Sequence, residues 1–351
     1  MLAAVSAFCL LLSAFKPALP GYEFQFPRDH GSHDEYQTEW WYYTGHLQTQ
    51  SGHRYGFEVT FFRVGVAPPD DRSQNRWDLK NLALAHFAIT DIDRRQFRYS
   101  EKLNRESPFT AWSSPEVLDV VNEGWSATTM PDGAWHIVAF NGGDRLDLVM
   151  RSRKPPAIHG ENGVSIKAEG AGYASHYYSM TRLDVAGMVN RETCRGIAWM
   201  DHEFGSSQLR ENQQGWDWFS IQFDDDTELM LYQMRRRDGT PDVTSSGSFV
   251  TSDGEVIHIT RDRMRIQPAG RWHSPGSGAT YPMGWHISVP ELGISVDVRP
   301  AMKNQELITH ASTNVTYWEG AVDITGSSRN TVVTGVGYVE MTGYAGRVSA
   351  P

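Results

Sequence analysis

The stretch Tyr55–Phe61 reads YGFEVTF, and in it a large apolar residue alternates with a small or polar one. Successive side chains of a β-strand point to opposite faces, so this alternation predicts a strand with one buried face. The same period recurs at Phe219–Phe223, which reads FSIQF, and at Ile294–Arg299, which reads ISVDVR. Runs at the helical spacing are hard to find, so the chain is predicted to be all-β.

Short turn signals separate these runs, at Ser51-Gly52, Asp132-Gly133, Asp238-Gly239 and Asp253-Gly254. Glycine supplies the positive φ that tight hairpins require. Strand, tight turn and strand make a meander, which loses its exposed edges by closing into a barrel. A chain of 351 residues has room for two such barrels, which we place at residues 21–200 and 201–351.

Residues 1–20 are predicted to be a signal peptide. Met1–Phe15 carries no charge and is too short to span a bilayer. Cleavage is expected after Ala14 or Ala18, which leaves Cys194 without a disulfide partner in the chain. We therefore expect an exported, soluble protein, periplasmic or secreted, and a monomer.

Composition and motifs exclude several functions. The formal net charge of −10 argues against nucleic-acid binding, which needs a dense basic surface. The sequence has no nucleophile elbow, no HExxH motif and no phosphate-binding glycine loop, so no metal and no cofactor are expected. His30 and His33, with the neighbouring Asp29 and Asp34, are interpreted as a solvated loop.

Several longer strings go beyond periodicity, and together they resemble the AttH-like and carotenoid 1,2-hydratase-like proteins over nearly all of the mature chain. They are FPRDHG at 26–31, TEWWYYTGHL at 38–47, AWMDHEFG at 198–205, GWDWF at 215–219, YWEG at 317–320 and GYVEMTGY at 337–344. The resemblance implies two lipocalin-like (calycin) antiparallel β-barrels packed together. It also implies hydration of isoprenoid double bonds in some members and cyclisation of polyenes in related fungal proteins.

Asp201 is the first catalytic candidate. A strand over residues 197–204 places Trp199 and Asp201 on one face and His202 on the other. A desolvated Asp beside Trp in a barrel interior has a raised pKa and becomes a better proton donor. In the carotenoid hydratases a similar Trp-Asp-His string holds the proposed acid, whereas WMDH here has one inserted residue. The alternative is a buried Asp that ties strands together, bonded to Arg182 or Arg195.

His176 and Tyr178 form a second catalytic candidate. Both would lie on one wall of a strand, where the imidazole positions water and the phenol ring stabilises a carbocation. The resemblance supports this interpretation, because hydratase relatives have a His followed by an aromatic residue two positions later. A core histidine bonded to a carbonyl is an equal alternative.

The first strand supplies candidate binding residues. Glu39, Trp41 and Tyr43 share one of its faces, Trp40 and Tyr42 share the other, and one face must enter the barrel. A carboxylate between aromatic rings, as at Glu39, must be paired or functional. The remaining expected binding residues are His86, Trp199, His202 and Trp218.

The resulting prediction is an enzyme that hydrates or isomerises a long apolar isoprenoid or polyene. Asp201 would protonate an alkene, aromatic rings would stabilise the cation, and water held by His176 would attack. One alternative is a non-catalytic carrier of a lipophilic ligand that delivers it to membrane export machinery. Another is a cyclase that acts through pocket shape alone.

Overall fold

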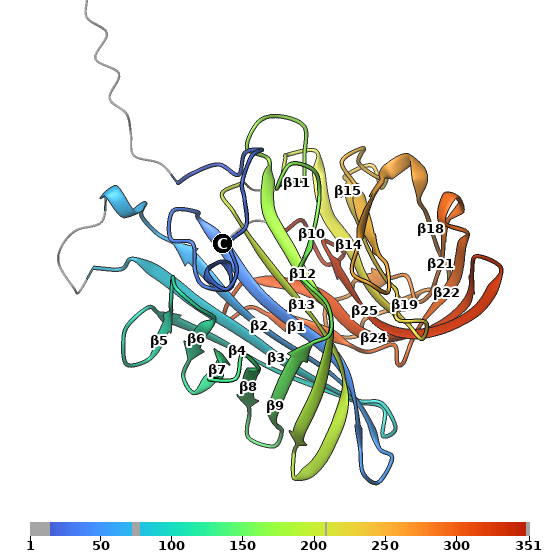
Figure 1. Ribbon diagram of the computed structural model, residues 1–351, viewed down its shortest axis with the longest axis horizontal. Helices are drawn as coiled ribbons and strands as arrows, with labels where there is room; N and C mark the ends of the chain where they lie inside the picture. The colour runs from blue at the N-terminus through green and yellow to red at the C-terminus, as the bar shows by residue number, and fades with distance from the viewer. Residues whose placement is uncertain (1–14, 72–77, 208, 349–351) are drawn as a thin grey trace, which may run out of the picture.

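The computed structural model describes residues 15–71, 78–207 and 209–348, and almost all of its regular structure is β-strand (Figure 1). Helical structure within these ranges consists of four short 3₁₀ turns: η1 (Arg28–His30), η2 (Pro69–Asp71), η3 (Arg261–Arg263) and η4 (Pro290–Leu292). None of the helices in the described ranges is both long and apolar enough to cross a membrane. The predicted all-β class is confirmed.

The first antiparallel sheet curls into a nearly closed barrel. Its hydrogen-bonded order is β4-β3-β2-β1-β13-β12-β9-β8-β7-β6-β5, and β10 and β11 also pair with β12. The strands are β1 (Thr38–Thr49), β2 (Arg54–Gly65), β3 (Asn81–Asp91), β4 (Gln96–Arg105), β5 (Ala111–Ser113), β6 (Asp119–Asn122), β7 (Trp125–Thr129), β8 (Trp135–Phe140), β9 (Arg145–Ser152), β10 (Ala157–Ile158), β11 (Ser165–Ile166), β12 (Ala174–Val189) and β13 (Glu192–Gly205).

The second sheet forms the second barrel in the order β17-β16-β15-β14-β25-β24-β22-β21-β18, with β23 paired to β24. Its strands are β14 (Gln213–Phe223), β15 (Glu228–Arg236), β16 (Ser246–Val250), β17 (Val256–Thr260), β18 (Arg265–Pro268), β21 (Trp285–Val289), β22 (Ile294–Pro300), β23 (Glu306–Thr309), β24 (Val315–Ser328) and β25 (Thr331–Thr342). A small separate ribbon pairs β19 (Trp272–His273) with β20 (Thr280–Tyr281).

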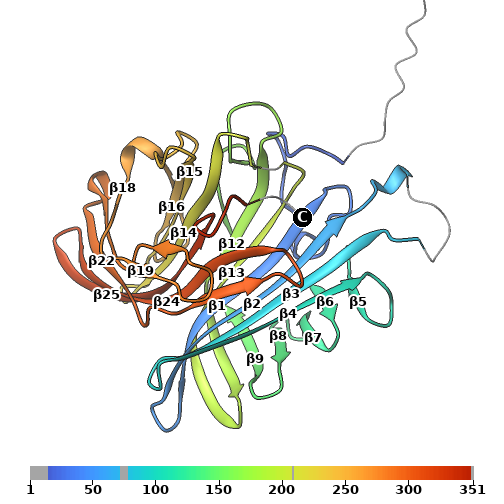
Figure 2. The same cartoon turned by 180° about the vertical axis from the view of Figure 1, so that it is seen from behind.

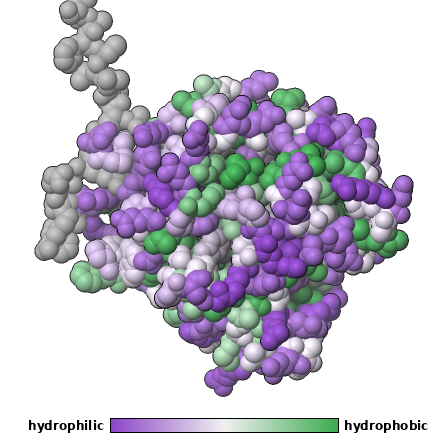
Figure 3. All heavy atoms as spheres, in the orientation of Figure 1, coloured by the Kyte–Doolittle hydropathy of each residue, from purple (hydrophilic) through white to green (hydrophobic). Residues whose placement is uncertain are grey.

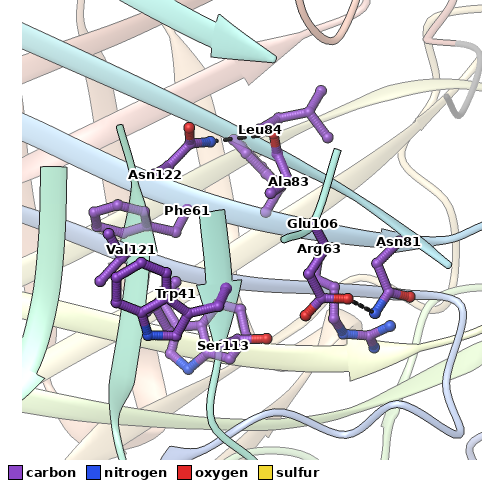
Figure 4. A pocket seen from close by; sticks show the side chains of 13 residues that line it. Trp41, Phe61, Arg63, Asn81, Ala83, Leu84, Glu106, Ser113, Val121 and Asn122 are labelled. Carbon is purple, nitrogen blue, oxygen red and sulfur yellow. Dashed lines mark hydrogen bonds between the residues drawn. The ribbon is translucent and has the colours of Figure 1, made fainter. Parts of the chain in front are cut away.

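The barrel interiors are packed cores. The apolar residues of Tyr55–Phe61 belong to the first core and those of Phe219–Phe223 belong to the second, as the alternation predicts. A void of about 10 Å³ remains at the wall of the first barrel, where Figure 4 shows Trp41 and Phe61 beside it. That is about the volume needed for one water molecule. A ligand pocket expected inside a barrel therefore has to be sought elsewhere.

The two sheets change over between Gly205 and Gln213, rather than after residue 200. β13 pairs with β1 up to the Thr38–Gly205 pair, so the C-terminal end of β13 also belongs to the first barrel. Asp201, expected at the start of the second barrel, lies in the first. Only the short run Gly205-Ser206-Ser207 marks this boundary in the sequence, and no Pro lies between Gly205 and Gln213.

The barrels pack side by side through their outer walls, as the two opposite views in Figures 1 and 2 show. β1 contacts β25 and β2 contacts β24. A buried group, here called the interface cluster, fills part of the junction: Tyr42, Tyr177, Trp199, Trp218, Met230, Tyr232, Met234, Ala321 and Tyr338. Polar residues cover most of the outer face seen in Figure 3, with scattered apolar patches between them.

The start of the described chain is packed onto the first barrel. The Lys16 backbone N–H donates to the Glu35 carbonyl at 2.8 Å, and Ala18 is buried. Residues 1–14 of the predicted signal peptide lie outside the described residues. The segment from Phe15 onward is part of the fold.

Candidate active site

A cavity of about 260 Å³ lies between the two barrels. Its wall takes residues from β1, β2, β3, β12 and β13 on one side and from β14, β15, β24 and β25 on the other. Aromatic rings contributed by both barrels dominate it: Trp40, Tyr42, Phe62, Tyr177, Trp216, Trp218, Tyr232 and Tyr317. The aromatic-lined pocket expected from the sequence is thus formed by two outer walls instead of one interior.

The alternation of side chains along each strand decides which residues reach this cavity. On β1, Trp40 and Tyr42 face the cavity, whereas Trp41 and Tyr43 belong to the first core. On β13, Asp201 lines the cavity and Met200 belongs to that core. A barrel wall packed against a second barrel is apolar on both faces, which explains the unbroken aromatic run of β1.

Asp201 is held by three hydrogen-bond donors. Ser179 Oγ and Trp199 Nε1 donate to Oδ1, the latter at 2.6 Å, and the Tyr177 hydroxyl donates to Oδ2 at 2.6 Å. Trp218 Nε1 of the second barrel donates to the Tyr177 oxygen at 3.0 Å. Burial raises the pKa of Asp201 to about 7, against the lowering effect of these donors. Asp201 therefore titrates near neutral pH on the cavity wall.

The expected arginine partners of Asp201 are not the ones observed. Arg182 lies beside Glu228, with Nε 2.6 Å from Oε1. The strand tie around Asp201 is made instead by Tyr177 and Ser179 of the neighbouring β12.

Two further carboxyls enter the cavity from the second barrel. Glu319 on β24 accepts a hydrogen bond from the Tyr42 hydroxyl at 2.7 Å, and Glu340 on β25 accepts one from Trp216 Nε1 at 2.9 Å. Glu319 and Glu340 are cross-strand partners. Burial raises the pKa of Glu340 to about 7, and burial together with the neighbouring carboxyls raises the pKa of Glu319 well above its usual value.

Neither carboxyl is predicted from the sequence, although both lie in the strings that carry the family resemblance, YWEG and GYVEMTGY. The argument applied to Glu39, that a carboxyl between aromatic residues must be paired or functional, applies equally to Glu319 and Glu340. Their positions could have been found that way.

A charged pair occupies another part of the wall. Lys167 Nζ lies 2.9 Å from Glu203 Oε1 and 4.3 Å from the centre of the Tyr232 ring. Glu203 also accepts a hydrogen bond from Ser175. Burial lowers the pKa of Lys167, but the Glu203 carboxylate outweighs it, so the net pKa is raised and the ammonium is retained.

His86 lines the cavity and connects the two barrels. Its Nδ1 lies 2.6 Å from the Tyr317 hydroxyl and its Nε2 lies 2.9 Å from Ser312 Oγ. Burial lowers its pKa to about 3, so the ring is neutral. Of the expected site residues, Asp201, His86 and Trp218 line the cavity, and Trp199 supports Asp201 from behind it.

His176 and Tyr178 do not share the cavity with Asp201. Their side chains take the opposite face of β12, whose cavity face carries Tyr177. His176 Nδ1 lies 2.7 Å from the Gly163 carbonyl oxygen, which is the core-histidine alternative. Tyr178 belongs to the first core and bonds His30 Nδ1 at 2.7 Å.

Glu39, Trp41, Tyr43 and His202 also lie away from the cavity, on the inner side of β1 and β13. Trp41 stacks on His202, with ring centres 4.9 Å apart. The buried Glu39 is paired, because Arg63 Nε lies 2.9 Å from its Oε2.

Most of the segment expected to be a solvated loop is buried, which corrects the sequence interpretation, although Asp34 stays partly exposed. Asp29 and His33 are almost fully buried, and His33 bonds Glu39 Oε1 through Nδ1 at 2.7 Å. His33, Glu39 and His202 place potential ligand atoms within 4.8 Å of one another. Three of their four ring nitrogens bond carboxylates, and the fourth, His202 Nδ1, lies 3.0 Å from the Asp29 carbonyl oxygen. Arg63 compensates the Glu39 charge, so this donor set is used by internal contacts.

Two packed antiparallel barrels with an acidic, aromatic-lined cavity between them define a two-barrel lipocalin-like protein. The AttH-like family profile matches residues 17–344, and the chain belongs to that family. A search of curated proteins finds no match.

The similar solved structures include three that each match more than 90% of this chain. A putative AttH from Nitrosomonas europaea is 32% identical with a TM-score of 0.84, and the match covers 94% of this chain and 99% of that one. Kievitone hydratase from Nectria haematococca is 13% identical with a TM-score of 0.72, covering 94% and 98%. CghA, solved with Sch210972, is 12% identical with a TM-score of 0.53, covering 95% and 97%. The last two show the fold alone.

Proposed function

We propose that the protein adds water to a carbon–carbon double bond of an apolar ligand bound between the two barrels. The observation that carries this is Asp201, a buried carboxyl with a pKa of about 7 on the wall of an aromatic cavity. A group that titrates near neutral pH transfers protons efficiently in both directions. The similarity to a hydratase of the same fold supports the reaction class.

The ring faces suit the cation that protonation of an alkene creates. Tyr42, Trp218 and Tyr317 line the cavity together with the carboxyls. An aromatic face attracts a cation most strongly when water is excluded. His176 lies on another face of β12, so the attacking water is held by groups of the cavity wall itself.

The cavity volume limits the substrate. An apolar cavity of about 150 Å³ binds benzene, and the one here measures about 260 Å³. It therefore encloses a ligand of about one ring with a short branched chain, or one end of a longer isoprenoid. A complete long polyene, as expected from the sequence, would extend outside it.

Binding without chemistry is the second candidate, and one observation favours it. Both oxygens of Asp201 already accept hydrogen bonds from protein groups, as a purely structural carboxylate would. A carrier, or a cyclase acting through shape, would use the same cavity and need no proton donor.

Labelled water separates these candidates. Purified protein incubated with geranylacetone or farnesol in ¹⁸O-enriched water is expected to yield a tertiary alcohol that carries the label. Heat-denatured protein is the control. Both compounds bound but recovered unchanged would favour the carrier, and a cyclic product without label would favour the cyclase.

We also propose that the protein is exported, and the fold favours one of the two expected cleavage sites. Cleavage after Ala14 keeps Phe15 and the buried Ala18, whereas cleavage after Ala18 removes both. We expect the protein recovered from periplasm or medium to begin at Phe15, as read by mass spectrometry of its N-terminal peptide. A start at Leu19, or intact Met1 found only in cytoplasm, would contradict this.

A further inference from the structure

Among the cavity carboxyls, Glu319 is the one with a fully buried oxygen that lacks a hydrogen-bond partner within the described residues. Its Oε1 accepts the Tyr42 hydroxyl at 2.7 Å, but its Oε2 has no hydrogen-bond partner among the described residues. The side chain is 1% exposed and lines the cavity. A buried polar atom without a partner is costly, and it calls for an explanation such as a role toward a ligand.

The position of the proton on Glu319 follows from these contacts. Burial, with Glu340 and Glu58 nearby, raises its pKa well above the usual value, which favours the protonated carboxyl. Tyr42 donates to Oε1, which must therefore act as the acceptor oxygen. The proton of the acid form is therefore placed on Oε2, which has no hydrogen-bond partner among the described residues.

Asp201 has the complementary arrangement. A carboxylate offers about four acceptor directions, and three of them at Asp201 are taken by Ser179, Trp199 and Tyr177. Donors around a carboxylate favour the ionised form, and one acceptor direction remains. Asp201 is thus better suited to receive a proton than to give one.

Tyr42 brings the two carboxyls together. It is the cross-strand partner of Asp201 on the cavity face of β1 and β13. Side chains in that relation have Cβ atoms about 5 Å apart. Because the Tyr42 hydroxyl also bonds Glu319, each barrel contributes one carboxyl beside the same phenol.

We infer that Glu319 is the proton donor and Asp201 the proton acceptor of the hydration proposed above, on which this inference rests. The Oε2 proton of Glu319 adds to the less substituted alkene carbon, where the π electron pair forms the new C–H bond. The other carbon becomes a tertiary cation. Water forms the C–O bond to that cation and loses a proton to Asp201, giving a tertiary alcohol. Proton exchange with solvent restores both carboxyls.

Glu58 offers a matched control. It is also buried, its Oε1 also accepts a hydroxyl hydrogen bond, from Thr60, and its Oε2 also lacks a partner among the described residues. Burial raises its pKa to about 8. Glu58 is not among the residues that line the cavity, and Glu58→Gln replaces one uncharged group near Glu319 by another at pH 7.

Infrared spectroscopy tests the proton on Glu319 without any turnover. At pH 7 the carboxylic-acid C=O band should lose one component in Glu319→Gln and a different one in Glu58→Gln. Addition of geranylacetone should shift the Glu319 component and leave the Glu58 component in place. An unchanged band in Glu319→Gln, or a Glu319 component indifferent to geranylacetone, would overturn the inference.

Turnover tests the donor role itself. Glu319→Gln should lower turnover of whichever compound the wild type hydrates by about 10²-fold, the usual contribution of a positioned acid. Glu58→Gln should stay within about twofold of the wild type. Glu319→Asp, which keeps the acid, should retain the infrared band and recover part of the rate. A thermal melt of each variant shows whether a lower rate comes from a folding defect instead of the lost acid.

Failure of the inference and failure of the proposed function give different results. Wild-type turnover that survives Glu319→Gln removes the donor role and keeps hydration. A wild type that hydrates neither geranylacetone nor farnesol removes the proposed function and the donor role with it, while the infrared band still reports whether Glu319 carries a proton.

Discussion

Asp201→Asn should lower turnover by about 10²-fold or more while the ligand still binds. The amide keeps the size of the side chain and one acceptor oxygen for Ser179 and Trp199, but it can neither give nor receive a proton at neutral pH. The measurement is kcat with the hydrated compound, together with a dissociation constant for that compound. A carrier would bind normally and show no turnover in either form.

A thermal melt must accompany this variant, because Asp201 also ties β13 to β12. The amide NH₂ would face the Tyr177 hydroxyl, which already accepts from Trp218, so a loss of about 1 kcal/mol in stability is expected. If the melting temperature falls while turnover per folded molecule is unchanged, Asp201 is a strand tie and not a catalytic residue.

His176→Asn tests whether His176, a catalytic candidate from the sequence that lies away from the cavity in the structure, takes part in the reaction. Asn can keep the hydrogen bond to the Gly163 carbonyl, and the side chain is bonded away from the cavity face of β12. We expect turnover close to that of the wild type. A loss as large as that of Asp201→Asn would restore His176 to the reaction.

The fold could be read from the sequence because each core strand obeys one period. The residues alternating at Tyr55–Phe61 and at Ile294–Arg299 enter the two cores as predicted. The cavity could not be placed in the same way. A strand on the barrel–barrel interface is buried on both faces, so alternation alone does not tell Trp40 and Tyr42 from Trp41 and Tyr43.

The candidate site shows the same limit. Asp201 was recognised because a string of the family marks it, but His176 and Tyr178 were assigned to the wrong side of β12, where Tyr177 and Ser179 face Asp201. A one-residue change of phase moves every side chain to the other face. Glu319 belongs to the other barrel, and only the packing of the two barrels brings it to Tyr42.

Glu39→Gln should destabilise the protein by about 3–5 kcal/mol, because removing one partner leaves buried charges uncompensated. Glu39 accepts from Arg63, His33 and His202 in the first barrel, and all four side chains are buried. The measurement is the free energy of unfolding in urea at pH 7. A loss below about 1 kcal/mol would mean that this network is not a main support of the barrel.

Glu58→Gln should behave in the opposite way, although Glu58 is an equally buried glutamate on the adjacent strand. The pKa of Glu39 is held well below its usual value by Arg63 and His33 against the cost of burial, whereas burial raises the pKa of Glu58 to about 8. A depressed pKa gives stability that is present above the unfolded pKa and lost as pH falls. A group whose pKa is raised on folding, as at Glu58, contributes its full stabilisation below the pKa of the unfolded chain. That contribution is lost as pH rises through about 8.

The two variants should therefore diverge with pH. The deficit of Glu39→Gln should shrink as pH falls below the usual glutamate range, because the wild type loses the benefit of the ionised Glu39. Glu58→Gln should match the wild type at acid pH and exceed its stability by about 4 kcal/mol at pH 8, since the amide cannot ionise. Urea unfolding of all three proteins across this range checks both slopes. Parallel curves would show that both glutamates have the same protonation state in the folded protein, and the contrast between paired and unpaired buried carboxyls would then be wrong.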